Sequence, residues 1–329
     1  MKPIYLHSAV CISAQNSFAE GEMEALNTTA STVAAKHPAY RNYIPLAAAR
    51  RMAPAVKMGV VAANVALEKA QITQPDAILT GSGLGCMQDT EKFLNALLES
   101  NEQFVPPTAF IQSTHNTVGA QIALGLGCKA YNNTYVHGSL SFESALLDAS
   151  LLLEDKADAK IVVGGVDELG TEFVNYVKML AEKETPASKI PMSEGASFFV
   201  VSSEMGNAQV LLRAMNTCRE VSVAEISNRV GSLLKENGLS EEDIDTLILG
   251  TTGAESDVYY KAVSDAFPKQ TTQIYFKKYA GQYNTSIGFA VWFAVQLIGE
   301  KNTVSDRKNI LIYNQEDGRN HSVIIVSRC

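Results

Sequence analysis

Two stretches of the sequence have a design that places a reactive side chain at the start of a buried helix. Residues 131–153 and 273–298 each combine a strand rich in β-branched or aromatic residues, a turn with glycine and a long apolar helix. Free N–H groups at the N-terminus of such a helix stabilise an anion. The first turn carries His137 and Ser139, the second carries Gln282, and neither carries a cysteine. A hydroxyl, an imidazole or an amide would therefore have to perform any chemistry at these two turns.

Each of these turns has two interpretations. Ser139 is a nucleophile if His137 serves as its base, although residues two apart in an extended turn usually point apart. In the other interpretation, Ser139 and Ser141 cap the helix that the pattern predicts over residues 142–154. Gln282 is either an amide donor to a thioester carbonyl or a carboxylate, or a residue that fills the turn with satisfied hydrogen bonds. Local chemistry favours the capping and space-filling roles.

The composition is that of an ordinary globular protein with a few scattered thiols. The 329 residues are 46% hydrophobic and 19% charged. A net charge of −8 without a basic stripe argues against nucleic acid as a partner. The five cysteines contain no CxxC, which predicts reduced thiols, a cytoplasmic location and no disulfide or metal site. The longest apolar run, 287–295, is too short to cross a membrane, and no motif predicts a cofactor.

The order of segments repeats, which predicts a duplicated α/β architecture. An apolar helix and a strand that begins at Asp76 lead into a glycine turn at residues 81–85. A second helix, which ends before Gly238, and a strand that begins at Asp245 lead into the turn at residues 250–253. The two strands are almost entirely apolar, which is typical of a sheet covered by helices on both faces.

The predicted fold class is therefore α/β, with duplicated halves over residues 1–203 and 204–329. Two such halves around a shared central helix layer form a five-layer α-β-α-β-α sandwich. The helices over residues 142–154 and 287–298 are apolar on nearly every face, which predicts that they are buried in the middle layer. The alternative of two independent Rossmann-like domains needs a GxGxxG turn after the first strand, and the sequence has none there.

From end to end, this order of segments resembles the thiolase-fold β-ketoacyl synthases. The glycine turn at 81–85, the strand end Gly164-Gly165-Val166 and the strand start Glu194-Gly195-Ala196 all match. The Gln282–Gly288 turn is similar to the family's GHxxGAAG turn. The resemblance implies the thiolase-like five-layer fold.

The resemblance also implies that the family's three catalytic side chains are replaced here. The family uses a cysteine and two histidines to take an acyl group from a thioester, decarboxylate a malonyl carrier protein and form a carbon–carbon bond. The family's spacing puts Ser139 at the cysteine position and Gly250 and Gln282 at the two histidine positions. A serine would need an adjacent base to attack a thioester. Cys86, in the first glycine turn, is expected to be a small buried hydrophobe.

One further segment, 107–116, resembles the part of ketosynthases that lies at the dimer interface and reaches towards the partner's acyl tunnel. The side chains expected at this interface and tunnel are Thr108, Phe110, Ile111, Gln112 and His115. His115 has a second interpretation as an ordinary residue at a helix N-terminus.

A ketosynthase scaffold without these catalytic residues resembles a chain-length factor, the inactive partner of a ketosynthase in type II polyketide, aryl polyene or dialkylresorcinol pathways. The resemblance implies a catalytic ketosynthase partner in a heterodimer, or a homodimer, together with an acyl carrier protein. That carrier is expected to dock at Arg50–Arg51 or Lys277–Lys278, because carrier proteins are acidic. Two alternatives stay open: an active synthase, acyltransferase or malonyl decarboxylase that uses Ser139 or Gln282, and a small-molecule binding protein. Whether the chain is an enzyme is thus undecided by its sequence.

Overall fold

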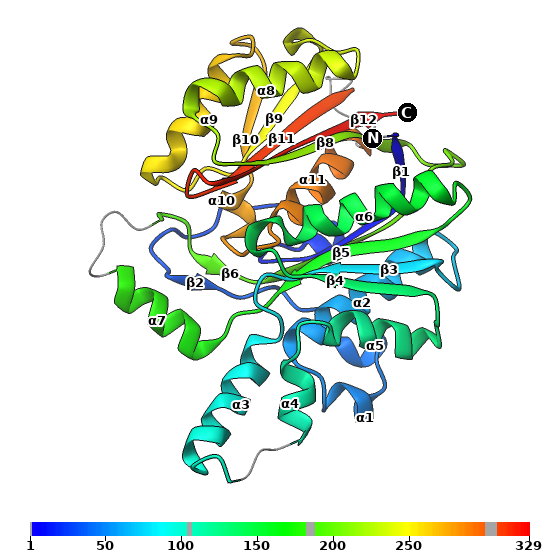
Figure 1. The fold of residues 1–329 in the computed structure, drawn as a ribbon, viewed down its shortest axis with the longest axis vertical. Helices are drawn as coiled ribbons and strands as arrows, with labels where there is room; N and C mark the ends of the chain where they lie inside the picture. The colour runs from blue at the N-terminus through cyan, green and yellow to red at the C-terminus, as the bar shows by residue number, and fades with distance from the viewer. Residues whose placement is uncertain (1, 104–106, 182–187, 300–307) are drawn as a thin grey trace.

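The fold has five layers of helices and strands (Figure 1). This computed structural model describes residues 2–103, 107–181, 188–299 and 308–329. Within these residues, ten strands form one mixed sheet in the order β10-β9-β11-β12-β8-β1-β7-β5-β3-β4. Helices cover the outer face of each half of the sheet and fill the space between the halves.

The strands of the first half are β1 (Ile4–Ile12), β3 (Ala77–Gly81), β4 (Tyr131–Tyr135), β5 (Ile161–Asp167) and β7 (Gly195–Ser202). Those of the second half are β8 (Val210–Arg219), β9 (Thr246–Leu249), β10 (Thr272–Tyr275), β11 (Asn309–Glu316) and β12 (Asn320–Arg328). A separate parallel pair consists of β2 (Thr32–Val33) and β6 (Met192–Ser193).

The α-helices are α1 (Leu46–Ala49), α2 (Pro54–Lys69), α3 (Met87–Glu99), α4 (Pro107–Ser113), α5 (Thr117–Leu126), α6 (Ser141–Asp155), α7 (Thr171–Ala181), α8 (Val223–Glu236), α9 (Val258–Asp265), α10 (Lys277–Ala280) and α11 (Ile287–Gly299). Short 3₁₀-helices are η1 (Ser17–Ala19), η2 (Tyr40–Asn42), η3 (Gly138–Leu140), η4 (Glu241–Asp243) and η5 (Glu255–Asp257). Among the described residues, no helix is long and apolar enough to cross a membrane.

The two halves of the sheet have the same strand order and the same directions. In the first, β3 is parallel to β4 and β5, β5 is antiparallel to β7, and β7 is antiparallel to β1. The second half repeats this pattern, with β9 parallel to β10 and β11, β11 antiparallel to β12, and β12 antiparallel to β8. A short ladder between Ile4–Leu6 and Val210–Leu212 joins the halves into one sheet, a link that the sequence did not predict. The predicted split after residue 203 falls in the turn between β7 and β8 and stays a prediction.

The two aspartates at the starts of β3 and β9 have the same role in each half. The backbone N–H of Asp76 donates to the Lys160 carbonyl, and the Asp76 carboxylate accepts from the Lys160 N–H at 2.9 Å. The Asp245 N–H donates to the Asn309 carbonyl, and its carboxylate accepts from the N–H groups of Lys308 and Asn309. Each carboxylate therefore fixes the beginning of the neighbouring parallel strand.

Three apolar cores lie between the five layers. The central core joins α6 and α11 with residues from both halves of the sheet, among them Phe142, Phe199, Phe289 and Ile312. The two outer cores lie under α2 and α5 on one side and under α8 and α9 on the other. Burying such apolar surfaces is the main favourable term in folding. The predicted thiolase-like five-layer fold is confirmed.

The two central helices differ in their exposure, which corrects the prediction that both are buried on every face. In α11 only Val295 and Gln296 are half-buried and only the last residue, Gly299, is exposed; the rest of the helix is buried. On α6, Leu147 is 48% exposed and Leu151 is 53% exposed. Residues four apart lie on the same side of a helix, so these two leucines form an apolar stripe on the surface. The stripe belongs to the helix that packs against the sheet-edge strand β4.

Candidate active site

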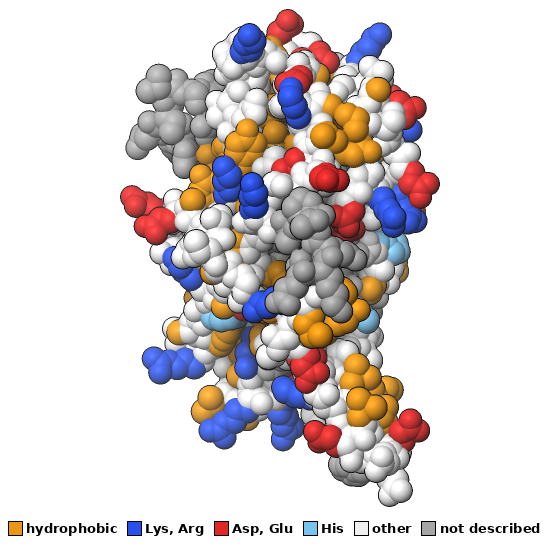
Figure 2. Space-filling view, turned by 90° about the vertical axis from the view of Figure 1, so that its left-hand side faces the viewer, with side chains coloured by type: hydrophobic (Ala, Val, Ile, Leu, Met, Phe, Trp, Pro, Cys, Tyr) orange, Lys and Arg blue, Asp and Glu red, His pale blue; other side chains and the backbone are white. Residues whose placement is uncertain are grey.

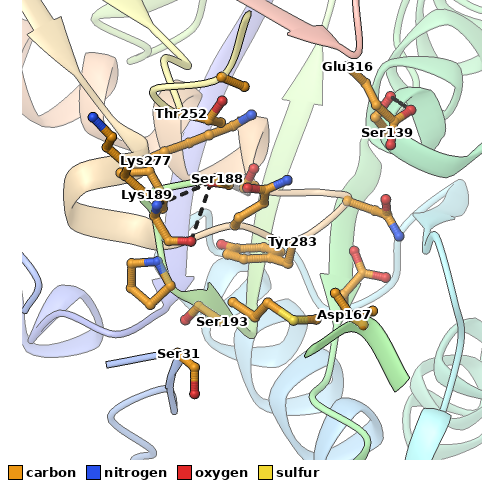
Figure 3. Close-up of a pocket in the computed structure, with 18 of the residues that line it drawn as sticks. Ser31, Ser139, Asp167, Ser188, Lys189, Ser193, Thr252, Lys277, Tyr283 and Glu316 are labelled. Carbon is orange, nitrogen blue, oxygen red and sulfur yellow. Dashed lines mark hydrogen bonds between the residues drawn. The ribbon is translucent and has the colours of Figure 1, made fainter. Parts of the chain in front are cut away.

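A pocket of about 720 Å³ lies where both repeated turns end, and both halves of the chain line it. Ser139, Lys277, Gln282 and Glu316 belong to its wall (Figure 3). The structure therefore brings two of the three predicted catalytic positions, Ser139 and Gln282, to one cavity. None of the described residues that line it is a cysteine or a histidine.

The Ser139 hydroxyl is held by a residue from the other half of the chain. Ser139 lies in η3, and its Oγ donates to Glu316 Oε2 at 2.7 Å (Figure 3). The same carboxylate oxygen accepts from Asn320 Nδ2 at 3.1 Å. A hydroxyl that donates to a carboxylate has an acceptor for its proton, which is one requirement of a serine nucleophile.

Neither serine caps the helix, so the capping interpretation is wrong. Helix α6 begins at Ser141, and its N-cap residue Leu140 makes no side-chain capping bond. Ser139 turns its hydroxyl towards Glu316 instead. The Ser141 hydroxyl accepts from the N–H of His137 and donates to the Gly138 carbonyl, so it closes the turn before the helix.

His137 is not placed as a base for Ser139. Its side chain is exposed, and Nδ1 hydrogen-bonds with the Ser144 hydroxyl at 2.8 Å. His321 is buried in the second half and pairs through Nδ1 with the Tyr313 hydroxyl.

Cys86 is a buried thiol, and burial raises its pKa, with the charges of Glu168 and Asp89 adding to the effect. This thiol therefore stays protonated, in agreement with the expectation of a buried hydrophobe.

The space that a side chain at Gly250 would need is already filled. A Cβ atom there would lie 2.2 Å from Asn314 Oδ1 and 2.9 Å from the Tyr260 hydroxyl. Asn314 lines the pocket, whereas Gly250 does not. No histidine fits at this position without moving Asn314, which itself packs against Tyr260.

Gln282 is held at the pocket wall by its backbone. Its N–H donates to the Pro191 carbonyl, and its carbonyl accepts from the Ser193 N–H at 3.0 Å. Gly281, before it, has φ +77°, and a Cβ there would lie 2.3 Å from Ser193. Only glycine suits this turn, because it needs both positive φ and a close approach of chain segments.

Asp167, which the sequence did not single out, ties the two glycine-containing turns together. Its Oδ1 accepts from the N–H groups of Gly83 and Leu84 and from the Ser82 hydroxyl. Its Oδ2 accepts from the N–H and the hydroxyl of Thr285, both at 2.8 Å. Burial raises the pKa of Asp167, and these hydrogen bonds oppose that effect. The sequence feature that could have identified Asp167 is its position directly after the Gly164-Gly165-Val166 strand end.

Glu143 is a second buried carboxyl that the apolar pattern concealed. It lies in the first turn of α6, is 1% exposed, and neither oxygen has a hydrogen-bond partner among the described residues. Burial raises the pKa of Glu143 to about 7; the nearby Ser322 hydroxyl lowers it in part, and the charge of Glu316 raises it further. The carboxyl is therefore mostly protonated below neutral pH.

Lys277 is buried, which corrects the expectation that Lys277–Lys278 is a surface spot for a carrier protein. Lys277 is only 5% exposed and lines the pocket. Burial lowers its pKa to about 8, although the charges of Glu316, Asp257 and Asp317 oppose that effect. Lys278 is exposed and lies over the Tyr275 ring.

The five side chains predicted for an interface lie outside this chain's own pocket. Thr108, Phe110 and Ile111 are exposed on α4, and Gln112 is half-buried. His115 is exposed between α4 and α5, and its side chain packs against the glycine turn at Gly85. Among the described residues, none of the five lines the cavity. Their tunnel role thus requires a partner and stays a proposal.

Among the described parts of the chain, no group of three histidine, cysteine or acidic side chains could hold a metal ion.

The comparison of the sequence with known protein families identifies the family of this chain. Residues 23–238, about two-thirds of the chain, match the family described as "Beta-ketoacyl synthase, N-terminal domain". The chain belongs to the β-ketoacyl synthase family. No curated protein sequence matches it.

Solved structures of ketosynthases have the same fold as this β-ketoacyl synthase family member. The ishigamide ketosynthase/chain length factor has a TM-score of 0.82 at 13% identity, over 100% of this chain and 99% of that chain. A β-ketoacyl synthase from Burkholderia phymatum STM815 has a TM-score of 0.80 at 14% identity, over 100% of both chains. The ketosynthase ApeO with its chain length factor ApeC, from Xenorhabdus doucetiae, gives 0.74 at 12%, over 100% and 98%. These similarities establish the fold, and activity has to be argued from the site.

Proposed function

We propose that this chain is a non-catalytic, chain-length-factor-type subunit that pairs with an active ketosynthase and shapes its acyl tunnel. One observation carries the proposal: the described pocket wall has no thiol and no imidazole. Ser139, Gly250 and Gln282 stand at the positions where the family's cysteine and histidines are expected. Without a thiolate and two imidazoles, the family's route from thioester to carbon–carbon bond lacks its nucleophile and its donors.

Surface chemistry supports a partner on the β4 side of the molecule. β4 is the last strand of the sheet, and within the described parts of the chain its outer edge pairs with no other strand, so it offers a place for another chain to pair. The strand, its flanking residues and the helices α5 and α6 that pack on it expose large apolar side chains, which we call the β4 edge region: Leu124, Tyr131, Val136, Leu147 and Leu151. Stable subunit interfaces are large and apolar at their centre.

Helix α4, next to α5, also exposes apolar side chains. It packs on α5 and exposes Phe110 and Ile111, two of the predicted interface residues. The names of two structural neighbours, the ishigamide and the ApeO–ApeC proteins, describe pairs of a ketosynthase and a chain length factor. We expect the same kind of pair here, in a polyketide- or polyene-type pathway.

An acyl carrier protein is the proposed third component. One structural neighbour is described as a ketosynthase with its type II acyl-carrier protein. On the face shown in Figure 2, lysine and arginine side chains gather at the lower left, whereas acidic side chains are scattered over the rest. Arg50 and Arg51 are exposed and stay the proposed docking spot, and Lys277 is excluded by its burial.

A serine-dependent acyltransferase is the second candidate, because the Ser139 hydroxyl already donates to the Glu316 carboxylate. A carboxylate in this position could accept the proton as the hydroxyl attacks a thioester. Glu316 also accepts from Asn320, so its oxygen is shared, which weakens it as a base.

Intact mass spectrometry after incubation with acyl- and malonyl-carrier proteins separates these candidates. Wild type, Ser139→Ala and Gln282→Ala would be compared, with peptide mapping and analysis of any acetyl-carrier protein. The proposed function predicts no acyl group on Ser139 and no malonyl decarboxylation. An adduct that maps to Ser139 and disappears in Ser139→Ala would support the acyltransferase. Decarboxylation that disappears in Gln282→Ala would also contradict a non-catalytic role.

A further inference from the structure

Lys277 places an amine inside the pocket where the catalytic side chains are missing. Its side chain lines the cavity and lies beside that of Thr252 (Figure 3). The residue is 95% buried from solvent, since only 5% of its surface is exposed. It is the first residue of the short helix α10, which positions its backbone between β10 and the Gly281 turn.

The ammonium form of Lys277 is poorly compensated. Among the described residues, no carboxylate lies within 4.0 Å of its Nζ, which makes no hydrogen bond there and lies over the Phe276 ring, 6.0 Å from the ring centroid. Glu316, Asp257 and Asp317 act on it only at longer range. Removing a charge from water without a close partner is unfavourable. The protonation equilibrium of Lys277 therefore shifts from the ammonium form towards the neutral amine. A neutral amine has a free lone pair and is a nucleophile.

The pocket also has a wall suited to an apolar chain. Helix α7 contributes Phe173, Val177 and Leu180 to the lining, and Ile190 and Met192 add to it. Thr252 lies beside Lys277, and the amide side chains of Gln282 and Asn314 also line the cavity. A ligand with an apolar tail and a polar carbonyl head matches both parts of this wall.

We propose that Lys277 is an acyl-acceptor site, whose amine takes the acyl group of a thioester that enters the pocket. The nitrogen attacks the carbonyl carbon, a C–N bond forms, and the C–S bond breaks. The amine proton goes to the leaving thiolate, so the products are an Nε-acyl-lysine and a free thiol. The reaction needs no oxidant, reductant or metal. The thioester class rests on membership of the family, and the modification is independent of pairing with a ketosynthase.

The experiment treats the full chain, without a partner, with the N-acetylcysteamine thioester of hexanoic acid at pH values from 6 to 10. Intact mass spectrometry gives the rate, and peptide mapping gives the site. We expect one hexanoyl group on Lys277, with a rate that rises with pH and is half-maximal at about 8. At pH 8 the exposed Lys278 should react at least about 10-fold more slowly, because it lies outside the pocket that would bind the thioester.

Matched variants separate the loss of the Lys277 amine from any loss of the folded structure. Lys277→Arg keeps the charge without a nucleophilic amine, Lys277→Met removes both, and Lys278→Arg is the control that should react as wild type. The proposal is overturned by equal labelling of surface lysines, by a half-maximal pH near 10, by no adduct, or by an adduct on Ser139. Since no ketosynthase is present, none of these results bears on pairing, and failure to pair leaves Lys277 acylation intact.

Discussion

Replacement of Leu147 and Leu151 together by aspartate is expected to abolish association with a ketosynthase while leaving the chain folded. Both leucines are about half exposed in the free chain, so the substitutions cost little in its own core. In a complex they would be covered, and two carboxylates would lose water without gaining partners. Burying unpaired charges costs several kcal/mol, so we expect the affinity to fall by about 100-fold or more.

Co-expression with a tagged ketosynthase from the source organism, followed by light scattering of the purified material, measures this effect. The matched control is Val223→Asp with Val258→Asp, which places two aspartates at exposed apolar positions of the outer helices α8 and α9. The control should co-purify as wild type does. Wild-type-like association of the Leu147→Asp/Leu151→Asp variant would show that the β4 edge region is not the interface.

Replacement of Asp167 by alanine is expected to cause the largest loss of stability. The carboxylate accepts from three backbone N–H groups and two hydroxyls, and its removal leaves these donors buried without their acceptor. Each unsatisfied buried group costs about 1–3 kcal/mol, and water that enters the space of the missing carboxylate would reduce the total for the five donors. We expect a loss of about 3–5 kcal/mol in the free energy of unfolding, with loosening of the turns at Gly83 and Thr285.

Urea unfolding of three variants tests this expectation. Asp167→Asn keeps one acceptor oxygen but presents an amide donor to the other N–H groups, so its loss should be smaller than that of Asp167→Ala. Asp158→Ala removes an exposed carboxylate and should change stability by no more than about 0.5 kcal/mol. A loss for Asp167→Ala as small as that of the Asp158 control would mean that the two turns hold their positions without this clamp.

The architecture was predictable because apolar runs and glycine turns are local signals. The predicted helix before the Asp76 strand is α2, and the predicted helix that ends before Gly238 is α8. The strands predicted to begin at Asp76 and Asp245 are β3 and β9. The capping box of Ser222 and Glu225 begins α8, and Gly238 follows its end with φ +68°. Each of these features needs only neighbouring residues to form.

The site was predictable only in part, because its contacts join distant residues. The spacing of residues led to Ser139 and Gln282. It did not lead to Glu316, the hydrogen-bond partner of Ser139, which lies 177 residues further along the chain. Lys277 looks like a surface residue in a Lys-Lys pair, and only the packing of α10 shows that it is buried. The apolar pattern of α6 predicted burial on every face, but Leu147 is 48% exposed, because no described element packs over that side of the helix. Local patterns do not report such contacts.

The condensation reaction itself tests the central proposal most directly. Three samples would receive acyl- and malonyl-carrier proteins: the chain alone, the catalytic ketosynthase alone, and the purified pair. Product lengths would be read by mass spectrometry. We predict that the chain alone forms no carbon–carbon bond and that the pair makes products of a defined length that the ketosynthase alone does not. Condensation by the chain alone, or the same product lengths with and without it, would contradict the account.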